Sequence, residues 1–100
     1  MTDELRQIQI EQLKLIQAAE ALISTCSKRK IRDYPGAPIN RNGFRLMKVG
    51  GELVDVSIKF TIAFLDANEA HLLTPEEYRE LSDQNLKAQK ISARAIRVLQ

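Results

Sequence analysis

Apolar residues follow a helical period over the first quarter of the chain. Between residues 2 and 25 they recur at alternating spacings of three and four, the a/d pattern of a heptad repeat, with Gln12 in the one remaining seam position. Ile16 and Ile23 widen the stripe to the breadth of a helix that packs on a core. The pattern predicts a helix over residues 2–25. Its seam positions are Leu5, Ile8, Leu15, Ala19, Leu22 and Cys26.

This stripe has two interpretations. It can pack on the rest of its own domain, or it can form a seam with a second copy of the chain. Apolar residues that lie off the stripe, such as Ile10 and Leu13, favour contacts on more than one side. We therefore expect a homo-oligomer, at least a dimer, whose contact includes Leu5, Ile8, Leu15, Ala19 and Leu22.

The period changes to two in the middle of the chain. Over residues 54–64 every second residue is Val, Ile or Phe, and the residues between them are polar or small. Such alternation is typical of a strand with one apolar face, whereas a helix would scatter the same residues all round. The Gly50-Gly51 pair precedes this run and suits the two-residue turn of a hairpin whose first strand is residues 44–49. We therefore predict a β-hairpin.

Two helix starts follow the predicted hairpin. Asp66 and Thr74 each stand three residues before a Glu, which is the capping-box pattern, and Pro75 suits the first position of a helix. We expect a short helix that ends near Leu73 and then a long helix that ends near Leu99.

Together these elements predict an α+β fold. Its order is a long N-terminal helix, a basic loop, a β-hairpin, a short helix and a long C-terminal helix, with the helices covering the apolar face of the hairpin. A chain of 100 residues with 44% apolar and 28% charged residues suits one folded, soluble domain over residues 1–100. No basic and apolar leader and no long apolar run is evident, so we expect a cytoplasmic protein that does not enter a membrane.

Residues suited to catalysis or metal binding are few. The one Cys, Cys26, lies in the apolar stripe, where it acts as a small hydrophobic residue, and the one His, His71, has no partner at a motif spacing. A structural zinc site needs four such ligands, and no Gly-rich phosphate loop is present. We expect no catalytic residue, no metal and no cofactor, and therefore not an enzyme.

Positive charge is concentrated in one segment. The net charge is only +2, yet residues 26–51 hold seven Lys and Arg residues against Asp33 alone. Turns at Pro35-Gly36 and at Asn42-Gly43 would fold this segment back on itself. The candidate ligand-binding residues are Lys28, Arg29, Lys30, Arg32, Tyr34, Arg41, Asn42 and Arg45.

A second basic group lies in the C-terminal segment. It comprises Lys87, Lys90, Arg94 and Arg97, which share one face of the predicted helix. Both groups could simply be solvated surface. Considered together, they favour an anionic ligand, because Arg and Lys are the side chains that bind phosphate.

The sequence therefore predicts a small, non-catalytic, self-associating binding protein. Its basic loop is expected to contact a phosphate-bearing partner, either nucleic acid or a nucleotide. The alternative is a small regulator or inhibitor, of the accessory type that phages encode, which acts only by protein contact. In that case the basic loop would meet an acidic protein surface.

Overall fold

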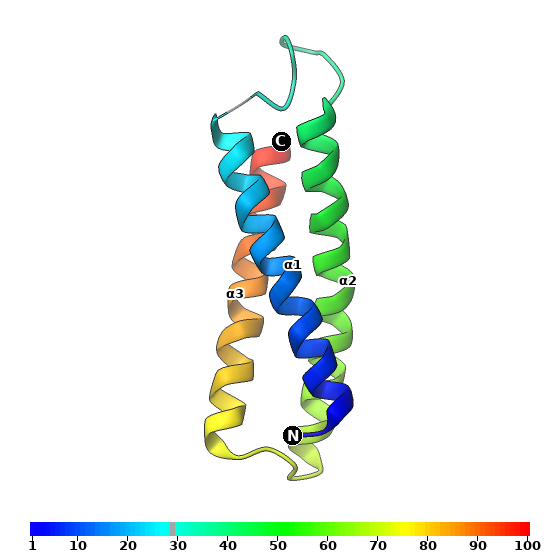
Figure 1. Ribbon diagram of the computed structural model, residues 1–100, viewed down its shortest axis with the longest axis vertical. Helices are drawn as coiled ribbons and strands as arrows, with labels where there is room; N and C mark the ends of the chain where they lie inside the picture. The colour runs from blue at the N-terminus through cyan, green and yellow to red at the C-terminus, as the bar shows by residue number, and fades with distance from the viewer. Residues whose placement is uncertain (29) are drawn as a thin grey trace.

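The computed structural model describes residues 1–28 and 30–100 and shows three long helices in an antiparallel bundle (Figure 1). α1 spans Asp3–Lys28, α2 spans Arg41–Glu69 and α3 spans Pro75–Leu99. Each helix packs on the other two, and the bundle measures 53 × 18 × 17 Å. The described residues contain no strand. The predicted α+β fold is therefore wrong, and the fold is all-α.

The helices predicted at the two ends of the chain are confirmed as α1 and α3. At the start of α3, Glu77 N donates to Thr74 Oγ1 at 3.1 Å and Thr74 N donates to Glu77 Oε1 at 3.0 Å, so the capping box forms as predicted. The hydrogen bond from the Thr74 backbone lowers the pKa of Glu77.

The predicted hairpin is wrong, because residues 54–64 belong to α2. In a helix, apolar residues at every second position form two series with a spacing of four, and the series lie about 200° apart around the axis. One series is buried and the other is exposed. A helix with two apolar faces therefore shows the same alternation as a strand. The buried series is Val56, Phe60 and Phe64, and the exposed series is Val54, Ile58 and Ile62.

Both predicted turns that flank residues 44–49, the expected first strand of the hairpin, are also wrong. Gly50 and Gly51 lie inside α2 without the positive φ that the expected hairpin turn requires. The Asn42-Gly43 pair lies in the first turn of α2, where the side chain of Asn40 accepts hydrogen bonds from both backbone N–H groups at 3.1 and 3.3 Å. Asn favours turns and helix N-caps alike, and here it caps a helix.

The predicted short helix after Asp66 is absent, because Asp66 lies in the last turn of α2. The helix ends beyond Glu69 in a Schellman motif, in which His71 N donates to Asn68 O and Leu72 N donates to Ala67 O, at 3.1 and 3.0 Å. His71 takes the left-handed position with a φ of 56°. The Asp–x–x–Glu pattern therefore falls at the end of a helix that is already formed.

A layer of hydrogen-bonded polar side chains crosses the middle of the bundle, and we call it the polar layer. Gln12 is fully buried, and its Nε2 donates to Ser57 Oγ and to Asn85 Oδ1, both at 3.1 Å. Gln84 Nε2 donates to Gln12 Oε1 at 3.0 Å, and Asn85 Nδ2 donates to Thr61 Oγ1 at 3.2 Å. These bonds join all three helices at one level.

The polar layer separates two apolar clusters of the core. The cluster on the side of the α1–α2 loop includes Ile16, Leu46, Leu53 and Ile91. The cluster on the other side is Leu5, Phe60, Phe64, Ala67 and Leu81. Because buried polar groups need their partners, the layer fixes the rotation of α2 relative to α1 and α3.

Candidate functional site

The antiparallel bundle gathers charge at its two ends. The α1–α2 loop, the start of α2 and the end of α3 lie together at one end, and the N-terminus lies at the other (Figure 1). The polar layer divides the chain into a basic half, residues 13–56 and 86–100, and an acidic half, residues 1–12 and 57–85. By sequence, the basic half holds twelve of the fifteen Lys and Arg residues and four of the thirteen Asp and Glu residues. The bundle is therefore strongly polarised along its long axis.

The loop at the basic end has a defined fold. Ala37 N donates to Tyr34 O at 3.0 Å, and Gly36 has a φ of 85°, so the turn predicted at Pro35-Gly36 is confirmed. Asn40 N donates to Ile31 O and Asn40 Nδ2 donates to Lys30 O, both at 2.7 Å. These bonds fold the segment back and place residues 30–31 beside the start of α2.

Close packing of the loop depends on the absence of a side chain at Gly43. Gly43 is buried, and a Cβ atom at this position would overlap the Cγ2 atom of Ile39. A side chain at residue 43 would therefore force Ile39 to move and would disturb the packing of the loop on the first turn of α2.

The predicted ligand-binding residues divide into exposed groups and groups that build the loop. Arg32 is half-buried, and its guanidinium donates to the carbonyl of Ala37. Asn42 is also half-buried, and its carbonyl accepts a hydrogen bond from Cys26 Sγ at 3.7 Å. Arg29 lies outside the described residues. The exposed members of the set are Lys28, Lys30, Tyr34, Arg41 and Arg45.

The cations on α2 lie where the helix dipole opposes them. Arg41 and Arg45 occupy its first turns, and that first turn contains no acidic residue. A cation at a helix N-terminus is destabilising by about 0.3–1 kcal/mol, since this end carries partial positive charge. The arrangement raises the positive potential of the basic end without stabilising the helix.

The four residues of the basic group on α3 are exposed, and one of them forms an ion pair. Lys87 Nζ lies 3.3 Å from Glu20 Oε1 on α1, so its charge is explained by an ion pair within the bundle. Arg97 lies in the last turn of α3, where a cation complements the dipole. Lys90 and Arg94 are exposed between them. The end of α3 therefore adds positive charge beside the loop.

The two residues considered for catalysis occupy structural positions. Cys26 is buried in the core, and burial raises the pKa of its thiol, which disfavours the nucleophilic thiolate. His71 follows Ala70, the C-cap of α2, in the left-handed position at the opposite end of the bundle. Within residues 1–28 and 30–100, no group of three or more His, Cys, Asp and Glu side chains could hold a metal ion.

The seam predicted on α1 lies inside the bundle. Leu5 and Ala19 are buried, and Ile8, Leu15 and Leu22 are half-buried against the same core. The seam therefore packs on α2 and α3. An interface between copies of the chain would have to use other surfaces.

The apolar surface that sequence reasoning missed is the outward face of α2, which we call the outer stripe. Its six large side chains are 43–57% exposed, and they follow one another at spacings of three and four around Gly51. The strict alternation of residues 54–64 was the available signal, since it implies a second apolar face in a helix. The outer stripe is Phe44, Met47, Gly51, Val54, Ile58, Ile62 and Leu65.

Two shallow hollows lie along the outer stripe. One, of about 600 Å³, lies over Gly51 between Phe44, Met47 and the cations Arg45 and Lys48. The other, of about 370 Å³, lies between α2 and α3 and is lined almost entirely by apolar atoms, including those of Val54, Ile58 and Ile96. Both are too open to enclose a small molecule but can accept side chains of a partner.

No protein-family model matches the chain, and no curated protein or solved structure matches it. Among the helices of the described chain, none combines the length and the apolar character required to cross a bilayer.

Proposed function

We propose that the protein is a non-catalytic binding protein whose basic half contacts a phosphate-bearing polymer, a nucleic acid. The observation that carries the proposal is the separation of charge across the polar layer. Twelve cations lie in the basic half, and within the described residues Lys87 is the one cation among them that forms an ion pair. A surface that needs only solvation has no reason to carry three times as many cations as acidic residues, as the basic half does with twelve against four.

A polymer fits this surface better than a single nucleotide. The exposed cations come from three segments, namely the loop, the start of α2 and the end of α3. A nucleotide site is normally an enclosed pocket, and the hollow beside Arg45 is open. A phosphate backbone can contact all three segments in turn, and such contacts need neither a pocket nor stacked aromatic residues.

The alternative is a regulator or inhibitor that acts by protein contact alone. The outer stripe favours a protein contact of some kind, because exposed apolar patches of this extent mark interaction sites. It does not account for the cations of the loop and of α3, which lie off that face.

Titration of labelled oligonucleotides tests the proposed function. Fluorescence anisotropy would follow binding of the full chain to single-stranded and double-stranded oligonucleotides and to a labelled nucleotide between about 50 and 200 mM salt. We expect binding to a polymer that weakens steeply with salt, and weaker binding of the nucleotide.

Substitutions in the two halves provide matched variants. Lys30→Gln and Arg94→Gln remove exposed cations of the basic half, and each should flatten the slope of log K against log salt by about 0.7–0.9. Arg6→Gln and Arg79→Gln remove exposed cations of the acidic half and should leave binding unchanged. Equal effects of all four variants, or no salt-dependent binding to either polymer, would contradict the proposal.

A further inference from the structure

The outer stripe extends along most of α2 on the side away from the core. Phe44 and Leu65 stand at its ends, so at 1.5 Å per residue it is about 32 Å long. Its spacings of three and four are those of a seam between two packed helices. No segment of the described chain covers it, since all six large side chains are 43–57% exposed.

Gly51 indicates that a partner can approach the outer stripe closely. Glycine is disfavoured in the interior of a helix. Nothing in the described chain lies within 4 Å of the position that a Cβ atom would take at Gly51, so the protein's own packing does not require a glycine there. Because Gly51 has no side chain, its backbone instead forms the floor of the hollow between Phe44 and Met47.

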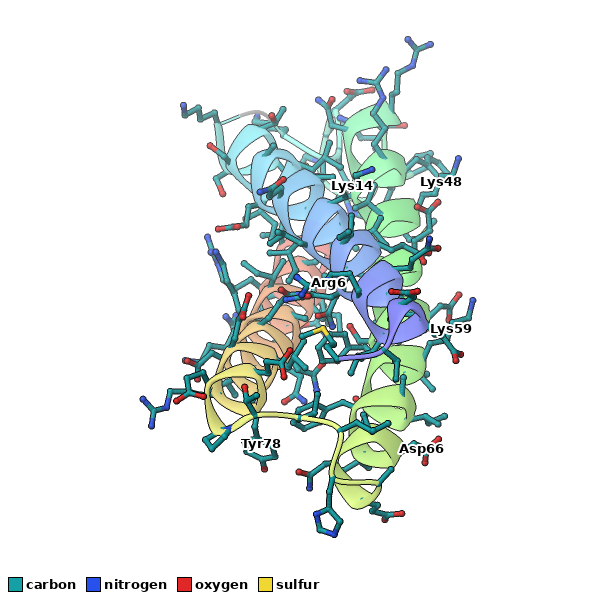
Figure 2. All side chains as sticks on the ribbon, turned by 60° about the horizontal axis from the view of Figure 1, so that its bottom comes forward. Arg6, Lys14, Lys48, Lys59, Asp66 and Tyr78 are labelled. Atoms are coloured by element: carbon teal, nitrogen blue, oxygen red, sulfur yellow. The ribbon has the colours of Figure 1, made fainter. Side chains whose placement is uncertain are left out.

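The charges of α2 indicate what covers the stripe. Residues 41–48 carry three cations and no acid, whereas residues 52–69 carry four acids and one cation. Figure 2 shows Lys48 near the basic end and Asp66 near the acidic end, both directed away from the other two helices. A second α2 in the antiparallel direction therefore matches the first in charge, and a parallel one would oppose it.

We propose that the outer stripe is the interface of an antiparallel homodimer, in which α2 of one copy packs on α2 of the other about a two-fold axis. This proposal does not depend on the nucleic-acid proposal. The loop and α3 cations lie outside the interface, and the cations at the start of α2 flank it, so the two proposed surfaces share this last group alone. An isologous contact uses the same patch on both copies, which suits a stripe whose two halves are complementary in charge.

The stripe also fixes the register of the two helices. Placing Val54 beside Ile58 of the second copy brings Met47 level with Leu65 of that copy. Lys48 then lies within about two residues of the second copy's Asp66, and the hollow over Gly51 faces the second copy's Ile62. Apolar layers and opposite charges therefore coincide in one alignment.

Sedimentation of three 100-residue proteins tests the dimer. At high micromolar concentration the wild-type chain should sediment at twice its 11.4 kDa mass. Ile58→Glu should sediment as a monomer, because two carboxylates would be buried at the centre of the interface. Ile10→Glu alters an apolar residue of α1 with similar exposure, 48% against 57%, and should remain a dimer. Circular dichroism must show that all three are helical.

Disulfide trapping tests the direction of the helices. The one native cysteine is removed as Cys26→Ser, and Met47→Cys and Leu65→Cys are made in separate chains. Mixing the two chains under mild oxidation should give the mixed disulfide, whereas each chain alone should give little. A folded wild-type monomer, or disulfides between identical chains in place of the mixed one, would overturn the proposal.

Discussion

The two apolar stripes of α2 have similar composition and opposite environments. The inner stripe, which is the buried apolar face of α2, lies against α1 and α3, whereas the outer stripe is about half exposed. Apart from Ala67, the inner stripe consists of Leu, Val and Phe, and apart from Gly51, the outer stripe consists of Phe, Met, Val, Ile and Leu. Hydrophobicity alone therefore does not decide which of them is buried. The inner stripe comprises Leu46, Leu53, Val56, Phe60, Phe64 and Ala67.

The polar layer supplies the difference between the two stripes. Ser57 and Thr61 lie beside the inner stripe, and each has a hydrogen-bond partner on another helix, Gln12 and Asn85 respectively. If α2 turned to bury the outer stripe, these partners would be left unsatisfied in the core, at about 1–3 kcal/mol for each buried group. Polar contacts, rather than apolar content, therefore select the buried face.

The largest expected effect compares one residue from each stripe. Phe60 is fully buried and stacks with Phe64 at a centroid distance of 6.2 Å, so Phe60→Ala should lower the free energy of unfolding by about 3–5 kcal/mol. Ile58 is 57% exposed, and Ile58→Ala should change it by roughly 0.5 kcal/mol or less. Urea denaturation followed by circular dichroism, at a protein concentration low enough to avoid association, measures both. Losses of similar size would mean that the outer stripe is also part of the core.

An intermediate effect is expected at the polar layer. Gln12→Leu removes two donated bonds and one accepted bond. Ser57 Oγ and Asn85 Oδ1 then lose the donor that they share, so unfolding should become easier by about 1–3 kcal/mol. Gln9 is the matched control, since it lies one turn away on α1 and its buried Oε1 has no hydrogen-bond partner among residues 1–28 and 30–100. Gln9→Leu should cost less than Gln12→Leu, or even stabilise the fold. The reverse order in denaturation would contradict a role for the polar layer in selecting the inner stripe.

The sequence was sufficient for α1 and α3, because the apolar residues of each form one dominant stripe with a helical period and α3 has a complete capping box at Thr74. It was insufficient for α2, since two faces of a helix and one face of a strand both produce the alternation from Val54 to Phe64. Local signals also favoured the wrong structure. The glycine pair suits a hairpin turn, and Asp66 suits a helix N-cap although it lies in the last turn of a helix. Only the partners of Ser57 and Thr61, far away in sequence, resolve the ambiguity.

The basic segment was predicted in part for a similar reason. Composition identified the excess of cations and the turn at Pro35-Gly36, which depends on adjacent residues. The role of Arg32 could not be predicted, because it depends on where the folded loop places the carbonyl of Ala37. Charge counts therefore locate a basic surface without separating the cations that build it from those that are exposed.

The smallest expected effect concerns the glycine pair between the two stripes. Gly51→Ala places a methyl group in open space, and Gly50→Ala brings one to an ordinary contact 3.8 Å from Ala95 Cβ. Each should raise the free energy of unfolding of the monomer by about 0.5–1 kcal/mol, because alanine is favoured over glycine inside a helix. Gly36→Ala is the control, and it should destabilise the fold, since Gly36 has a φ of 85°.

Thermal or urea denaturation of the three variants at low protein concentration gives the sign of each change. In the hairpin that the alternation suggested, Gly50 and Gly51 would need positive φ, and alanine at either position would destabilise the protein as it does at Gly36. Destabilisation by Gly51→Ala would therefore contradict both the helical conformation and the outer stripe that depends on it. Stabilisation of the monomer together with a weaker dimer would show that the protein keeps this glycine for its interface and not for its fold.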